Sequence, residues 1–208
     1  MHSEAFSASL LLACMVCFFA ANIRNILTTR RTSEKTTEPH VEVEMPSGFI
    51  VNLAAFGTFI YFIAAFTYVA LVIIDRFSWV GPISLLLPDQ IAIAALVIGS
   101  AFTVTGYAVF IWSVIARGRY ATSWEMHEDH RLVTWGPYKH VRHPSYLAYF
   151  LMFLGLFILW PSLITLIPIA AVPSYVLVTY QEERHLEKRF GEEYEQYRKK
   201  TGRFLPKF

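Results

Sequence analysis

Long apolar runs alternate with polar segments along the chain. Three runs, at residues 5–23, 48–74 and 90–116, are each close to or above the roughly 20 residues that a helix needs to cross a bilayer. Charged residues close each run. The pattern therefore predicts three membrane-spanning helices within the first 116 residues.

The next apolar run, at residues 145–180, holds 36 residues without a formal charge and is interrupted by Trp-Pro-Ser at 160–162. A single helix of that length would measure about 54 Å, whereas a bilayer core is about 30 Å thick. A helical hairpin fits better, and Pro168 and Pro173 are expected to bend its second arm. The chain is thus predicted to be all-α and polytopic, with five transmembrane helices, the last two forming a hairpin.

Residues 181–208 have the opposite composition, with six glutamates and eight lysines or arginines. Apolar side chains recur among them at helical spacing, at Leu186, Phe190, Tyr194 and Tyr197. This spacing predicts a surface helix with one apolar face. Gly202 and Pro206 are expected to end it.

The distribution of cations predicts the orientation. The loops after the first and third spans carry four and five Lys/Arg and the tail carries eight, whereas the loop after the second span carries one and the hairpin tip none. With five crossings, 17 of the 18 cations share the face of the C-terminus, which the positive-inside rule makes cytoplasmic. The N-terminus is therefore expected outside, and the C-terminus in the cytoplasm together with the polar segments 117–143 and 181–208.

Composition agrees with a membrane protein. The chain is 55% hydrophobic and 16% charged, with a mean hydropathy of +0.41. Its net charge of +2 is too small to indicate a nucleic-acid partner. Cys14 and Cys17 lie inside an apolar run, which favours small buried side chains over a redox pair or a zinc site.

Residues 136–146 gather two histidines, two cations, two tyrosines and two prolines. Pro137 and Pro144 restrict the backbone, which predicts a shaped turn with a helix starting near Pro144. Because the two ends of a hairpin are neighbours, this turn should approach Glu182 and Glu183. Histidine, arginine and carboxylates together there could bind a charged small molecule.

Two other interpretations of this segment stay open. The charges could simply anchor helix ends at the membrane surface. Alternatively, His127 with His130 and His140 with His143 could be histidine boxes of a membrane metal oxidase. Against the second, prolines break the helix around the latter pair and the other spans offer no further ligand histidines, so no metal is expected.

Two motif blocks carry a family resemblance. They are Leu132-Val133-x-x-Gly136-x-Tyr138-x-x-Val141-Arg142-His143-Pro144-x-Tyr146 and Glu182-Glu183-x-x-Leu186-x-x-x-Phe190-Gly191-x-x-Tyr194-x-x-Tyr197. In this order, and a hairpin apart, they resemble the isoprenylcysteine carboxyl methyltransferase family and, more loosely, the wider group of membrane phospholipid methyltransferases. The resemblance covers the chain from Thr122 to the C-terminus. The first three predicted spans resemble the family only in being apolar helices, not in specific motifs.

The resemblance implies an integral membrane enzyme that uses S-adenosylmethionine to methylate the carboxylate of an isoprenylcysteine-like lipid. Three N-terminal helices, in residues 1–116, would precede a methyltransferase module with a cytoplasmic cofactor-binding cap, in residues 117–208. By position, the cofactor would be bound by His130, Leu132, Val133, Tyr138, His143, Pro144, Tyr146 and Glu183. The implied catalytic residues are Arg142, Glu182 and Glu183, with Arg142 near the carboxylate of cofactor or substrate.

The acceptor determines which chemistry the residues must supply. A carboxylate is already ionised near neutral pH, so its methylation needs positioning and exclusion of water rather than a strong base. An amine acceptor, as in phospholipid N-methylation, would need a histidine or glutamate base. Phospholipid N-methylation and a membrane scaffold with a degenerate site both remain alternatives. Cations of the tail could bind anionic membrane lipids or a substrate headgroup.

Overall fold

The computed structural model describes residues 2–33, 41–42, 48–78, 89–120, 125–126 and 131–207. Within these residues the protein is almost entirely helical, which confirms the all-α class. The helices are α1 (His2–Ser33), α2 (Gly48–Ile73), α3 (Asp89–Arg117), α4 (Pro144–Leu159), α5 (Leu163–Ala170), α6 (Val172–Phe190) and α7 (Glu192–Lys200). The short 3-10 helices η2 (Gly118–Tyr120) and η3 (Gly136–Lys139) and an antiparallel pair, β1 (Val41–Glu42) with β2 (Glu125–Met126), complete the described elements.

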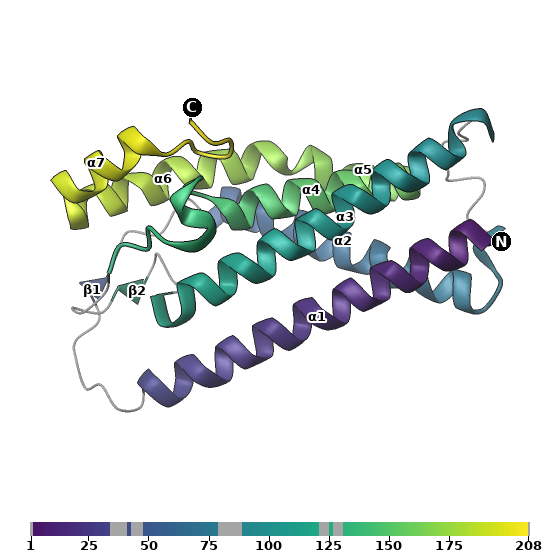
Figure 1. Cartoon of the computed structure of the whole chain (residues 1–208), viewed down its shortest axis with the longest axis horizontal. Helices are drawn as coiled ribbons and strands as arrows, with labels where there is room; N and C mark the ends of the chain where they lie inside the picture. The colour runs from purple at the N-terminus through teal and green to yellow at the C-terminus, as the bar shows by residue number, and fades with distance from the viewer. Residues whose placement is uncertain are drawn as a thin grey trace.

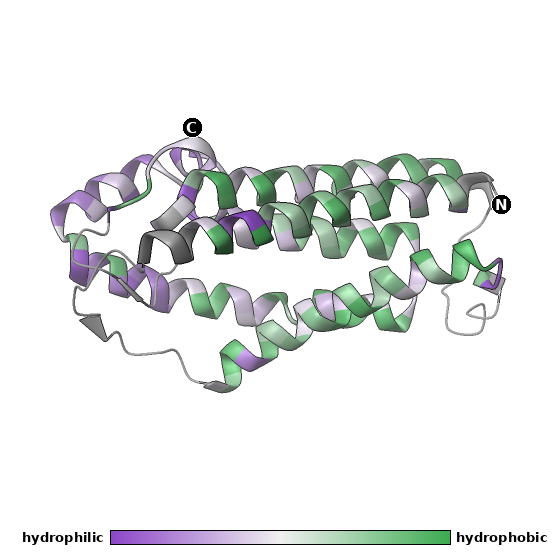
Figure 2. Ribbon diagram, turned by 90° about the horizontal axis from the view of Figure 1, so that it is seen from below, coloured by the Kyte–Doolittle hydropathy of each residue, from purple (hydrophilic) through white to green (hydrophobic). Residues whose placement is uncertain are grey.

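The long helices run side by side along one axis, and the chain reverses direction between them (Figure 1). The N-terminus lies at one end of this bundle, whereas α7 and the C-terminal segment lie at the other. Apolar residues cover the length of the bundle, and hydrophilic residues gather at the α7 end (Figure 2). Large apolar side chains such as Phe49, Ile73 and Ile93 are strongly exposed, as suits helices that face lipid.

Four described helical segments are long and apolar enough to cross a membrane, namely Glu4–Thr28, Gly48–Ile73, Ala92–Arg117 and Leu163–Phe190. The remaining predicted span, the first arm of the hairpin, corresponds to α4, which is apolar but has only 16 residues. The helices thus support a multi-pass membrane protein.

Two predicted boundaries are wrong. The first span was expected to end at residue 23 and give way to a loop, but α1 continues to Ser33. The tail was expected to form one separate helix, yet α6 continues through Tyr180 to Phe190 without a break. Gly191, with φ of 51°, then turns the chain into α7, because this left-handed conformation is accessible to glycine. Helix α7 ends at Lys200, just before Gly202 as predicted.

The predicted hairpin is confirmed. Helix α4 ends at Leu159, and Ser162 caps the start of α5 by accepting a 3.3 Å hydrogen bond from the Thr165 amide. The expected bend in the second arm is a short break at Ala171, which separates α5 from α6. Pro173, near the start of α6, has no amide hydrogen to continue the α5 ladder.

Close packing of α3 on α4 fixes the position of α4, the helix that follows the predicted turn. A Cβ atom placed on Gly155 would lie 2.5 Å from Thr103 Oγ1, and one on Gly106 would lie 2.7 Å from Met152 Cγ. Small residues on both helices therefore allow α3 and α4 to pack closely. At the α7 end of the same pair, the hydroxyls of Ser113 and Ser145 share a 2.7 Å hydrogen bond.

Candidate active site

The predicted turn is present and leads directly into α4, which begins at Pro144. Gly136 has φ of 60° and is the first residue of η3. The Trp135 indole donates a 2.8 Å hydrogen bond to the Ala116 carbonyl of α3. From α7, the Tyr197 hydroxyl donates a 2.7 Å bond to the Tyr138 carbonyl. The turn is therefore bonded to α3 on one side and to α7 on the other.

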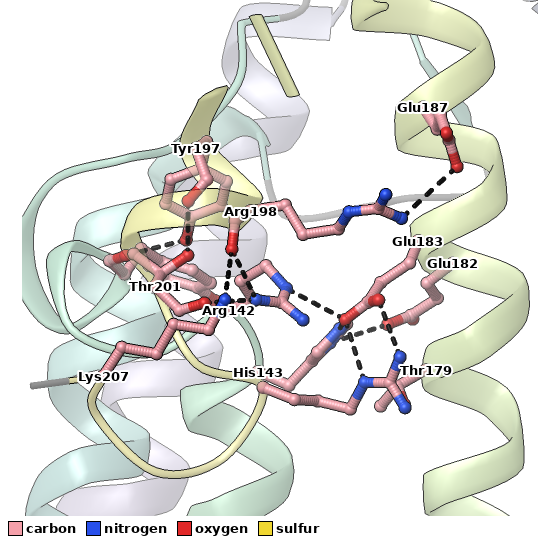
Figure 3. A network of polar contacts seen from close by, with 12 residues as sticks. Arg142, His143, Thr179, Glu182, Glu183, Glu187, Tyr197, Arg198, Thr201 and Lys207 are labelled. Atoms are coloured by element: carbon pink, nitrogen blue, oxygen red, sulfur yellow. Dashed lines mark hydrogen bonds and ion pairs between the residues drawn. The ribbon is translucent and has the colours of Figure 1, made fainter. Parts of the chain in front are cut away.

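Glu183 is the centre of the polar network at this end of the bundle. Its Oε1 accepts hydrogen bonds from Arg142 Nε at 3.0 Å and Arg203 Nε at 3.0 Å, and it lies 3.1 Å from His143 Nε2 (Figure 3). Its Oε2 accepts a 2.8 Å bond from Arg203 Nη2. Glu183 is only 5% exposed, and such a buried charge is tolerated because cations and hydrogen bonds surround it.

His143 joins Glu183 to its neighbour Glu182. Its Nδ1 lies 3.3 Å from Glu182 Oε2, and the other oxygen of Glu182 accepts a 2.7 Å bond from the Tyr146 hydroxyl. Burial by itself lowers the pKa of His143, but its hydrogen bonds to Glu182 and Glu183 outweigh burial and raise the pKa above the ordinary value of 6.5. The geometry thus favours an imidazolium that donates from both nitrogens.

A cavity of about 250 Å³ lies against this network. Its wall includes five of the predicted cofactor-binding residues and the predicted catalytic Arg142; these six residues are Leu132, Val133, Tyr138, Arg142, His143 and Tyr146. The remaining lining residues are Phe110, Arg117, Tyr120, Arg131, Ser145, Tyr149, Leu186 and Tyr197. The structure therefore brings most of the predicted site together around one pocket.

The other predicted residues occupy different positions. Pro144 is buried at the start of α4 and is not part of the pocket wall. Glu182 and Glu183 stand behind the wall, where they contact the lining residues His143 and Tyr146. His130 lies outside the described residues.

Arg142 lines the pocket and is also held by the protein itself. Besides its bond to Glu183, its Nη1 donates to the carbonyls of Arg198, at 3.4 Å, and Thr201. This guanidinium is therefore fixed in orientation at the pocket wall.

Comparisons with known proteins agree with the motif blocks. The family model described as phospholipid methyltransferase matches residues 94–193. The protein-S-isoprenylcysteine O-methyltransferase of Schizosaccharomyces pombe is 40% identical over 83 residues, which cover 38% of this chain and 34% of that protein. The enzyme of the same name from Tribolium castaneum is 34% identical over 90 residues, covering 39% of this chain and 30% of that protein. The family resemblance is confirmed.

The matched stretches span about a third of the length of these curated relatives. The solved structure of the eukaryotic intramembrane Ras methyltransferase, isoprenylcysteine carboxyl methyltransferase, without a monobody, matches with a TM-score of 0.41 and 23% identity. That match covers 79% of this chain and 54% of the other.

Several residues of the site were not anticipated from the sequence. Tyr149 lies one helical turn after Tyr146, so the spacing of the two tyrosines could have indicated a shared face. Phe110 lies inside the third apolar run and Arg117 directly follows that run; both belong to α3, and no motif singled them out. Arg203 follows Gly202 near the end of the chain and no motif singled it out, although it bonds to both oxygens of Glu183.

Proposed function

We propose that this protein is an S-adenosylmethionine-dependent integral membrane methyltransferase that methylates the carboxylate of an isoprenylcysteine-like lipid. The activity, the cofactor and the acceptor are all part of the proposal. The observation that carries it is the pocket, which joins the polar cap to the apolar bundle. Phe110 lies seven residues inside the α3 end, a depth of about 10 Å at 1.5 Å per residue.

The charges around the pocket favour an anionic acceptor. Arg117, Arg131 and Arg142 contribute to the wall, and none of the described lining residues is acidic. A carboxylate is therefore attracted to the pocket, whereas an ammonium would meet like charge. Glu182 and Glu183, which could serve an amine as bases, are engaged by His143, Arg142, Arg203 and Tyr146.

The aromatic lining residues fit two parts of the proposed cofactor, its adenine ring and its sulfonium. S-adenosylmethionine would supply a methyl group activated on a sulfonium, together with an adenine ring, an ammonium and a carboxylate. The aromatic rings of Tyr138, Tyr146 and Tyr149 offer faces for a flat base and for a sulfonium cation. Burial raises the pKa of Tyr138, so its hydroxyl stays neutral and can donate or accept a hydrogen bond.

Under this proposal the protein catalyses mainly by positioning the acceptor carboxylate next to the methyl group of the cofactor. Arginines at the wall hold the acceptor carboxylate, which is ionised near neutral pH and needs no base. The network of Glu183 keeps Arg142 and His143 in fixed orientations, so little reorganisation is needed when the acceptor binds. The apolar part of the pocket limits the access of water to the reacting groups.

The proposed topology has five crossings, with α4 as a short fourth span and the cap in the cytoplasm. The cation count supports this orientation, because 17 of 18 Lys/Arg then share the cytoplasmic face. Helix α4 is about 24 Å long at 1.5 Å per residue, so it spans most of a core of about 30 Å. In this proposal residues 1–116 form the membrane scaffold and 117–208 the methyltransferase module.

Phospholipid N-methylation is the second candidate, because the matching family model carries the description phospholipid methyltransferase. The phosphate group of a phospholipid could bind the same arginines. The amine of its headgroup would then need a base to remove a proton before methylation. His143 is held between two carboxylates, which raise its pKa and favour the protonated form that cannot accept a proton.

The two candidates differ in the bond that they form. The full chain in lipid nanodiscs is incubated with methyl-labelled S-adenosylmethionine and either a farnesylated cysteine derivative or phosphatidylethanolamine. A carboxyl methyl ester releases its label as methanol in base, whereas an N-methyl group does not. We expect base-labile label on the farnesylcysteine only. Base-stable label on the phospholipid would favour the second candidate, and no transfer to either would contradict both.

A further inference from the structure

After α7 the chain returns to the turn that precedes α4. Residues 201–207, here named the C-terminal strap, run beside the turn in a parallel pairing of Val141 with Gly202. The Arg142 amide donates to the Gly202 carbonyl at 2.9 Å, and the His143 amide donates to the Arg203 carbonyl at 3.0 Å. The strap is therefore bonded to the backbone of two pocket-lining residues.

Arg203 is the side chain of the strap that enters the polar network. Its Nε and Nη2 donate to Oε1 and Oε2 of Glu183 at 3.0 and 2.8 Å, which is a two-point contact of a planar guanidinium with a carboxylate. The guanidinium carbon lies 3.7 Å from the centre of the Tyr180 ring, so the aromatic face also holds it.

This contact determines the orientation of the Glu183 carboxylate. Among the hydrogen bonds found in the described residues, Oε2 is bonded only by Arg203, whereas Oε1 also contacts Arg142 and His143. Without the two-point contact the carboxylate could rotate. Arg142 and His143 would then no longer have a hydrogen-bond acceptor in a fixed position. Because both side chains belong to the pocket wall, the wall would lose its fixed geometry.

We propose that the C-terminal strap is part of the active site and that Arg203 is a positioning residue, which orients Arg142 and His143 through Glu183. The inference rests on the proposed methyltransferase function. Arg203 is absent from the described residues that line the pocket, so it acts through Glu183 rather than on bound reactants. It also lies beyond residues 94–193, the stretch that the family model matches.

The test compares Arg203→Ala and Arg203→Lys with the matched control Arg198→Ala. Arg198 makes ion pairs with Glu195 and Glu187 at the surface, where its side chain is 41% exposed. Alanine at this position keeps the backbone carbonyl that Arg142 contacts. Each full-length variant is assayed in nanodiscs for kcat and for KM of S-adenosylmethionine and farnesylated cysteine. Assays are repeated with methylguanidine, which can occupy the place of the missing guanidinium, and a melting curve is recorded for each variant.

We expect Arg203→Ala to lower kcat at least about tenfold, as loss of charge-assisted hydrogen bonds does, with the acceptor KM nearly unchanged. Methylguanidine should restore part of this kcat, Arg203→Lys should be intermediate because it keeps the charge without the planar contact, and Arg198→Ala should match wild type. If the alanine variant does not fold, the kcat of the lysine variant decides the test.

Wild-type kcat in both Arg203 variants would overturn the inference alone. So would a loss that follows the amount of folded protein and does not respond to methylguanidine. An inactive wild-type protein would overturn the proposed function and the inference with it, and this outcome is distinguishable because it appears before any substitution.

Discussion

At the scale of single residues, His143 has the most constrained environment of the site. Its two nitrogens lie 3.3 and 3.1 Å from Glu182 and Glu183, and its ring is stacked near that of Tyr146. A histidine that only anchored a helix end at the membrane surface would not need two buried carboxylate partners. The contacts therefore favour a site residue over an anchor.

The protonation of His143 predicts a pH-dependent stability. Because its pKa in the folded protein is raised above 6.5, its charge stabilises the fold fully below the unfolded-state pKa. This contribution is lost as pH rises through the folded-state pKa. The melting temperature of wild type should therefore exceed that of His143→Gln most at acidic pH, and the difference should shrink on the alkaline side.

The measurement is a series of melting curves in one detergent from acid to alkaline pH. His140→Gln, which replaces an exposed histidine of the same turn, is the control and should change the melting temperature little. A wild-type advantage over His143→Gln that stays constant, or grows with pH, would contradict a charged His143.

At the scale of helices, the contact between α3 and α4 holds both walls of the pocket in register. Phe110 of α3 and Tyr149 of α4 line the pocket and pack against each other with ring centres 5.1 Å apart. Further along the pair, Gly155 allows the backbone of α4 to lie directly against Thr103. A side chain at this glycine would force the helices apart.

Gly155→Val should therefore destabilise the protein by about 1–3 kcal/mol, as overpacking of a close contact does. Gly48→Val is the matched control, because a Cβ atom on Gly48 has no other atom within 4 Å. Thermal unfolding of both variants in the same detergent checks this. Equal melting temperatures for the two variants would show that the α3–α4 contact is not tight.

The accuracy of sequence-based prediction also differs from element to element. Helices α2 and α3 were predicted to within one residue at each end, because their apolar runs are long and bounded by charged or proline-rich segments. The end of α1 was missed because helix continues into polar residues, where hydropathy gives no signal. The break at Gly191 was missed because the apolar spacing of Leu186, Phe190 and Tyr194 continues across it.

Prediction of the site had a similar limit. Tyr138, Arg142, His143 and Tyr146 could be predicted because they lie in one compact motif that begins a helix. Arg203 could not, because its role depends on a return of the chain after α7 that no local pattern encodes. The sequence also could not show that Glu183 faces protein cations rather than the open pocket.

At the scale of the whole molecule, the N-terminus and the cap lie at opposite ends of the bundle (Figure 1). In the proposed five-span topology these two ends lie on opposite sides of the membrane. Single cysteines at positions 3 and 207, with Cys14 and Cys17 replaced by alanine, should therefore react with an impermeant thiol reagent from opposite sides. We expect residue 207 to react from the cytoplasmic side. Labelling of both positions from one side would contradict the five-span topology.

The central claim is that the pocket of the cap binds S-adenosylmethionine, and calorimetry on the purified full chain tests it most directly. Wild type should bind S-adenosylhomocysteine, the product form, at one saturable site per chain. Val133→Trp should abolish binding, because Val133 lines the cavity of about 250 Å³ and an indole there would fill much of it. Val16→Trp, on an exposed face of α1, should bind as wild type does. Absence of binding to wild type, or unchanged binding to Val133→Trp, would contradict the account.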